Sequence, residues 1–216
     1  MNRAVVHQAA ALLLGYPDRD WPGRLHAVRS ALEPVPGADI RLLRQFCARV
    51  DGTAPLDLAA RYVATFDRSR RRCLYLTYYT DGDTRRRGTT MAGLKALYRD
   101  HGWQPPADEL PDFLPLMLEF AARTPDTGAR LLADHRPALE LLRFGLAAYS
   151  SPYADVIEAV CLTLPGPGPA TLEAAQRLAR TGPPAESVGL LPFPRLRPVP
   201  DTPQAPHSPH VEETSR

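Results

Sequence analysis

The sequence predicts an all-α fold, arranged as a single compact helical bundle. Apolar residues recur at helical spacing through most of the chain before Pro183, as in amphipathic helices that pack on a shared core. No stretch shows the strict alternation of apolar and polar residues, bounded by turns, that indicates a half-buried strand. The chain has 216 residues, of which 44% are hydrophobic, and this is enough for one substantial core. We therefore expect one helical domain over residues 1–182.

The individual helices follow from local periodicity and from stop signals. The first expected helix runs to about Leu13, where Gly15 and Pro17 supply a stop. In the segment LDLAARYVATFD the apolar residues fall on one stripe of a helix. Further helices are expected at 22–33, 39–49, 56–67, 89–102, 108–123, 128–134, 137–149, 152–164 and 169–180.

Residues 76–88, LTYYTDGDTRRRG, place two aspartates before three consecutive arginines. Arginines in the first turn of a helix oppose the positive end of its dipole and need compensation. We expect Asp83 or Thr84 to cap the free amide groups of that turn, and Asp81 and Asp83 to neutralise the arginines. Gly82 permits the tight turn between the aspartates. The corner is then either a self-paired surface feature or a partner-binding site.

The segment DELPDFLPLMLEF at 108–120 predicts a helix with an apolar stripe. Pro111 suits its first turn, and Pro115 is expected to kink it, because proline removes a backbone donor inside a helix. Asp112 and Glu119 fall at the borders of the stripe. They form either the polar rim of a peptide-binding groove or solvated positions beside a core stripe. The stripe itself consists of Leu110, Phe113, Leu114, Met117 and Phe120.

Composition and motifs argue against several classes of function. The 26 basic and 24 acidic residues leave a net charge of only +2, so a broad electrostatic surface for nucleic acid is not indicated. The three cysteines are far apart and lack the paired spacing of a disulfide framework or a metal site. No glycine-rich phosphate loop, Gly-x-Ser-x-Gly or His-Glu-x-x-His motif occurs. We therefore expect no metal, no cofactor and no catalytic residues.

The two ends of the chain carry separate signals. The N-terminal apolar segment contains His7 and Gln8 and lacks a cleavage signal, and no stretch reaches the ~20 apolar residues of a membrane span. We expect a soluble protein of the reducing cytoplasm that does not insert into a membrane. Residues 183–216 contain nine prolines and are expected to form a mostly disordered tail. Its apolar run VGLLPF could still dock on the domain.

Residues 62–88, YVATFDRSRRRCLYLTYYTDGDTRRRG, and 109–122, ELPDFLPLMLEFAA, resemble two motif blocks of the NarJ-type chaperones. These proteins assemble the molybdenum cofactor into respiratory nitrate reductase and belong to the wider TorD and DmsD class of redox-enzyme maturation chaperones. Asp81 stands where the first block often has histidine. The other positions of that block are matched by Phe66, Asp67, Arg70, Gly82, Asp83, Thr84, Arg85, Arg87 and Gly88.

The second block of the family has the pattern Leu-Pro-Asp-His-Leu-Pro. Leu110 to Pro115 match it, with Phe113 in place of the histidine. That change removes an ionisable ring and leaves a hydrophobic contact at this position. Segments at 12–21 and 146–160 are also similar to the family, so the resemblance covers about residues 5–182.

The resemblance implies a cytoplasmic chaperone without enzymatic activity. It would bind the N-terminal segment of the nitrate reductase catalytic (alpha) subunit and assist molybdenum cofactor insertion before the enzyme docks at the membrane. Proteins that deliver the molybdenum cofactor are further implied partners. The expected client groove has the 110–120 stripe as its floor and Asp112 and Glu119 on its rim. Its residues are Tyr78, Tyr79, Pro111, Asp112, Phe113, Leu114, Pro115, Met117 and Glu119.

Three alternatives remain open at this point. The same chaperone type could serve another molybdoenzyme, such as a dimethyl sulfoxide or formate enzyme. A helical nucleic-acid-binding protein could use the arginine cluster between Arg68 and Arg87. An enzyme is the third alternative, although no catalytic motif supports it.

Overall fold

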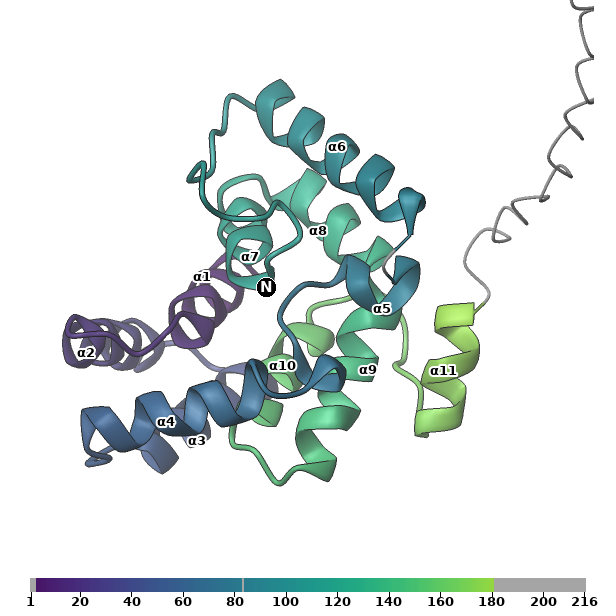
Figure 1. Ribbon diagram of the computed structural model, residues 1–216. Helices are drawn as coiled ribbons and strands as arrows, with labels where there is room; N and C mark the ends of the chain where they lie inside the picture. The colour runs from purple at the N-terminus through teal and green to yellow at the C-terminus, as the bar shows by residue number, and fades with distance from the viewer. Residues whose placement is uncertain (1–2, 83, 181–216) are drawn as a thin grey trace, which may run out of the picture. The chain divides into compact units, whose positions relative to one another are not determined.

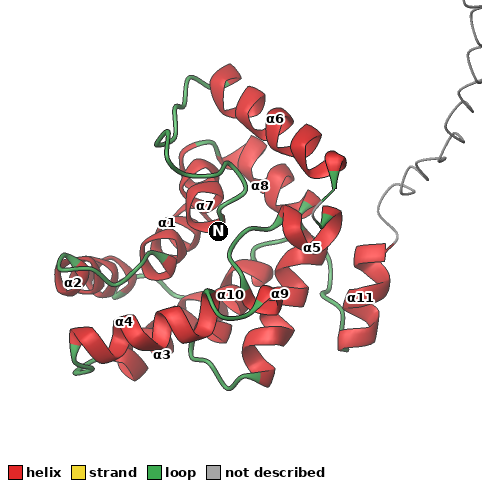
Figure 2. Ribbon diagram, viewed as in Figure 1, coloured by secondary structure: helices red, strands yellow, loops and turns green. Residues whose placement is uncertain are grey.

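The computed structural model describes residues 3–82 and 84–180. Within these ranges the chain forms eleven α-helices and one short 3-10 helix, and it contains no strand (Figure 2). The prediction of an all-α fold is confirmed for this part of the chain. Asp83 and the tail predicted at 183–216 lie outside the described residues.

Four helices begin the chain, and their limits agree closely with the sequence prediction. They are α1 (Arg3–Leu14), α2 (Trp21–Leu32), α3 (Ala38–Val50) and α4 (Pro55–Phe66). Proline stands in the first turn of α2 and α4, where a backbone N–H has no partner within the helix. α1 is buried along most of its length, with α2, α3 and α10 (Tyr153–Leu162) beside it (Figure 1).

The motif blocks occupy the middle of the chain, and they contain short elements. These are η1 (Arg70–Arg72), α5 (Thr77–Asp81) and the longer α6 (Arg85–Asp100). The C-terminal half continues with α7 (Leu114–Arg123), α8 (Pro125–Asp134), α9 (Arg136–Ala148) and, after α10, α11 (Leu172–Arg180). α9 packs against α10, α11, α5 and η1. It therefore joins the C-terminal helices to the first motif block.

An aromatic cluster ties α3 and α4 to α10. Phe66 of α4 packs on Tyr153 of α10 with 4.8 Å between ring centroids, and Phe46 of α3 meets the same ring at 4.9 Å. Tyr62 lies 4.8 Å from Phe66, and its hydroxyl donates to the carbonyl of Leu14 at 2.9 Å. Edge and tilted contacts of this kind add to the burial of large rings. The cluster fixes Phe66, from which the first motif block continues.

The region of Pro111 and Pro115 differs from the prediction. α7 begins at Leu114, so Pro115 lies in its first turn and causes no kink. Residues 101–113 form turns and irregular backbone, where a helix was expected from residue 108. The two prolines therefore mark the entry to the helix and do not interrupt it.

Candidate functional site

The two motif blocks meet through backbone hydrogen bonds. The amide of Leu114 donates to the carbonyl of Leu74 at 2.8 Å, and the amide of Leu76 donates to the carbonyl of Asp112 at 3.1 Å. Each of these residues is buried. The second block is therefore the support on which α5 rests.

Asp112 is fully buried and joins three segments of the chain. Its Oδ2 accepts hydrogen bonds from the Thr77 hydroxyl at 2.5 Å and from the Thr77 amide at 3.3 Å. The Arg87 guanidinium pairs with the same oxygen at 3.5 Å and also donates to the Thr77 hydroxyl at 3.1 Å. The prediction that Asp112 lies on an exposed groove rim is wrong. Its partners are 35 and 25 residues away in sequence, and they draw it into the core.

Asp81 is the second buried carboxylate of the first block. Its Oδ1 pairs with Arg86 at 3.3 Å, and its Oδ2 accepts from the Thr90 hydroxyl at 2.7 Å. The prediction that Asp81 neutralises the arginine run is confirmed for Arg86. Thr84 makes no side-chain cap, because its hydroxyl donates to the Asp81 carbonyl at 2.8 Å. Gly82 has a φ of 58°, which suits the predicted tight turn.

The apolar stripe that was expected to line a client groove is largely core. It packs against α1 and α8, and this contact removes it from the surface. Phe113 and Glu119 keep partial exposure; Glu119 pairs with Arg123 at 2.7 Å. The prediction of an open groove floor is therefore wrong for most of the stretch 110–120, although Leu110 is 39% exposed. Its buried members are Pro111, Asp112, Leu114, Pro115, Leu116, Met117, Leu118 and Phe120.

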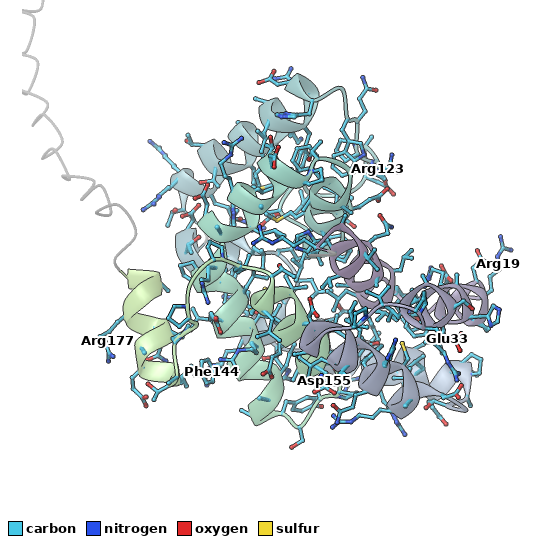
Figure 3. The ribbon with its side chains drawn as sticks, turned by 180° about the vertical axis from the view of Figure 1, so that it is seen from behind. Arg19, Glu33, Arg123, Phe144, Asp155 and Arg177 are labelled. Atoms are coloured by element: carbon cyan, nitrogen blue, oxygen red, sulfur yellow. The ribbon has the colours of Figure 1, made fainter. Side chains whose placement is uncertain are left out.

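Tyr78 and Tyr79 open onto a different groove, which lies between η1, α5, α9 and α11 and has a volume of about 550 Å³. Its walls are mainly apolar and aromatic. Figure 3 shows Phe144 on the side of α9 that faces α11. The chain thus brings residues from both halves of the sequence to one surface. The aromatic and aliphatic residues that line the groove are Tyr78, Tyr79, Leu141, Phe144, Ala148, Tyr149 and Leu172.

A second, smaller hollow of about 170 Å³ adjoins this groove. Four of its lining residues are matched positions of the first motif block: Phe66, Asp67, Arg70 and Arg87. Arg70 and Tyr78 line both hollows, and the Arg70 guanidinium lies 5.8 Å from the centre of the Tyr78 ring. The motif residues that are scattered in sequence are therefore gathered here.

A family model described as "Nitrate reductase delta subunit" matches residues 32–158. The chain belongs to the nitrate reductase delta subunit family. The matched span includes both motif blocks and the walls that η1, α5 and α9 contribute to the groove.

This delta subunit family member has two relatives that are named as assembly chaperones. It is 32% identical over 165 residues to a probable nitrate reductase molybdenum cofactor assembly chaperone NarJ of Bacillus subtilis, covering 76% of this chain and 90% of the relative. It is 37% identical over 150 residues to NarJ of Escherichia coli, covering 68% of this chain and 64% of the relative. The resemblance to NarJ-type chaperones is confirmed. These relatives are named as chaperones and not as catalysts, in agreement with the expectation of no enzymatic activity.

Two further comparisons concern a longer relative and a solved structure. The chain is 41% identical over 160 residues to the nitrate reductase-like protein NarX of Mycobacterium tuberculosis, but it spans only 24% of that relative. A solved redox enzyme maturation protein from Archaeoglobus fulgidus has a TM-score of 0.55 and 22% identity, over 75% of this chain and 92% of that one. It shares the fold of the delta subunit family member.

The polar groups around the groove hold its walls in place. Arg72 donates from Nε to the carbonyl of Thr65 at 2.9 Å, and its guanidinium lies 3.8 Å from the centre of the Tyr149 ring. The Tyr79 hydroxyl donates to the carbonyl of Cys73 at 3.0 Å. Burial raises the pKa of the Tyr79 phenol and of the Cys73 thiol, so both side chains stay neutral. Neither side chain is therefore an activated nucleophile.

Sequence reasoning missed the contribution of α9 and α11 to this site. Leu141, Phe144 and Tyr149 fall within or just after a helix that was predicted only as part of the bundle. One sequence signal was available: Phe144 and Tyr149 are large aromatic residues that do not fall on the buried face of that helix.

Within the described residues, no group of three His, Cys, Asp or Glu side chains could hold a metal ion. The same part of the chain contains no helix with the length and apolar character required to cross a membrane.

Proposed function

We propose that this chain is an assembly chaperone of respiratory nitrate reductase. It binds the N-terminal segment of the catalytic (alpha) subunit and assists insertion of the molybdenum cofactor before the enzyme docks at the membrane. The observation that carries the proposal is the aromatic groove beside α5, whose walls come largely from the segments that the family model matches. The names of the NarJ relatives, which are nitrate reductase assembly chaperones, support the choice of client.

The groove suits a peptide helix or an extended peptide with apolar side chains. Its lining offers four aromatic rings and two leucines, and burial of apolar client surface contributes roughly 25 cal/mol per Å². The chain's own α11 packs as a helix against α9 and α5, so this face already accepts one helix. A client helix would lie on the remaining open side, against Tyr78, Phe144 and Tyr149.

The role of the second motif block changes accordingly. Asp112 does not touch the client, because it is buried. It holds Thr77 at the start of α5, and α5 carries Tyr78 and Tyr79 into the groove. The block therefore positions the binding surface from behind.

Calorimetry with a synthetic peptide of the client N-terminus tests the proposal on a matched pair of tyrosines. Tyr149 in the groove is 47% exposed, and Tyr16, outside it, is 49% exposed. Tyr149→Ala should weaken binding about tenfold or more, because an aromatic anchor is lost. Tyr16→Ala should leave the affinity unchanged. If wild-type protein does not bind the peptide, or if both variants bind like the wild type, the proposed site is wrong.

A further inference from the structure

One wall of the groove carries a concentrated positive charge. The lining includes Arg70, Arg71 and Arg72 of η1, and among the described residues that line it there is no Asp or Glu. Asp67 lines the adjoining smaller hollow and not this groove. Since the other walls are mainly apolar, a charge held at this wall acts in a less screened setting than one on open surface.

The three arginines are not equivalent. Arg72 is committed to the chain itself, because it binds the Thr65 carbonyl and lies over Tyr149. Arg70 lies over Tyr78, and neither Arg70 nor Arg71 forms an ion pair with any residue that the structure describes. Both keep exposed side chains. Arg70 and Arg71 are therefore the groups that a bound partner can reach.

The backbone that presents these arginines is held tightly against α9. At Gly145 of α9, a Cβ atom would lie 2.7 Å from the Arg71 carbonyl oxygen, so only glycine permits this approach. The Arg72 side chain anchors the other end of η1 to the Thr65 carbonyl of α4. A wall fixed in this way loses little freedom when a partner binds, and guanidinium groups pair with carboxylates in a defined geometry.

We infer that the groove selects an acidic amphipathic client helix, in which a carboxylate lies about one turn from an apolar anchor. The apolar side chain packs on Phe144 and Tyr149, and the carboxylate accepts hydrogen bonds from Arg70 or Arg71. A basic segment with the same apolar face is disfavoured, because its charges meet the arginine wall. This inference rests on the proposed function, since it takes the groove as the client site.

Three synthetic amphipathic helices of about 15 residues test the charge preference without knowledge of the client. They share one apolar face and carry Glu, Gln or Lys at the positions beside it. In fluorescence anisotropy with the full chain, the Glu peptide should bind about fivefold tighter than the Gln peptide, and the Lys peptide weakest. Arg71→Gln should bring the Glu and Gln peptides close to equal affinity. Arg41→Gln, an exposed arginine of α3 outside the groove, should leave the difference intact.

Equal affinities for the Glu and Gln peptides, a preference for the Lys peptide, no binding of the Glu peptide, or a preference untouched by Arg71→Gln would each overturn the inference. These results are separable from failure of the proposed function. If the client N-terminal peptide binds at Tyr149 but the charge series is flat, only the inference fails. If the Glu peptide binds through Arg71 but the client peptide does not bind, the proposed client is wrong and the charge preference stands.

Discussion

Asp112 is a residue whose burial reverses the effect expected of its substitution. On an exposed rim, its loss would weaken client binding and leave stability unchanged. In the structure its carboxylate is fully buried, accepts a hydrogen bond from Thr77 and forms an ion pair with Arg87. Removing one member of a buried charged group takes away part of the compensation of the others.

Asp112→Ala should therefore lower the free energy of unfolding by about 3 kcal/mol. This is somewhat less than the loss expected when one partner of a fully enclosed ion pair is removed, because the Arg87 side chain keeps some contact with water. Urea unfolding followed by circular dichroism measures this change. Glu119→Ala is the matched control, because its pair with Arg123 on the surface of α7 should contribute less than about 0.5 kcal/mol. Equal unfolding midpoints for the two variants would contradict the assignment.

For single residues, the sequence predicted local charge pairing better than it predicted burial. The ion pair between Asp81 and Arg86 was predictable, because the two residues are only five positions apart in the sequence. The burial of Asp112 was not, because it depends on Thr77, which is 35 residues distant. A carboxylate at the border of an apolar stripe looks the same in sequence whether it faces water or a buried arginine.

At the scale of elements, α9 matters most for the site because it contacts η1, α5 and α11. Gly145→Ala places a Cβ 2.7 Å from the Arg71 carbonyl, and η1 must move away. We expect a loss of about 1–3 kcal/mol in stability together with weaker peptide binding.

Gly93→Ala in α6 is the control for Gly145→Ala. Nothing lies within 4 Å of the added Cβ, and alanine is the better helix former, so this variant should gain about 0.5–1 kcal/mol. Thermal unfolding and calorimetry on both variants separate the two effects. If Gly145→Ala is as stable as Gly93→Ala and binds peptide normally, η1 is not held by this contact.

The long helices were predictable from periodicity, and the short elements were not. α3 and α4 were located to within about two residues, because each has a wide apolar face and a clear stop. α5 has only five residues, TYYTD, too few for a helical period to show. It forms because Asp112 holds its first residue and α9 supports its side chains.

At the scale of the whole molecule, His7 joins the beginning of the chain to the end of α10. Its Nε2 lies 2.9 Å from the Thr163 hydroxyl, which itself donates to the Val160 carbonyl at 2.7 Å. The Thr163 oxygen is therefore the acceptor and His7 the donor, as a neutral imidazole. Burial lowers the pKa of His7 from 6.5 to about 4.

This lowered pKa makes stability depend on pH. The unfolded chain binds a proton at His7 below pH 6.5, while the folded chain resists it down to about pH 4, so stability is full above pH 6.5 and falls between these values. The loss should approach about 3 kcal/mol at the lower limit. Urea titrations at several pH values measure it. His7→Gln keeps a donor for Thr163 and does not titrate. The free energy of unfolding of this variant should therefore fall by about 3 kcal/mol less than that of the wild type between pH 6.5 and pH 4. An identical pH dependence of stability in the two proteins would contradict the assignment.

The contact of Asp112 with Thr77 and Arg87 also bears on how this chain can change through evolution. Each of the three side chains binds the other two. Replacement of any one of them alone should therefore reduce the amount of folded protein. We therefore expect a change at one of these positions to be accompanied by changes at the others. Selection would then act on the two motif blocks jointly, although they are separated in the gene.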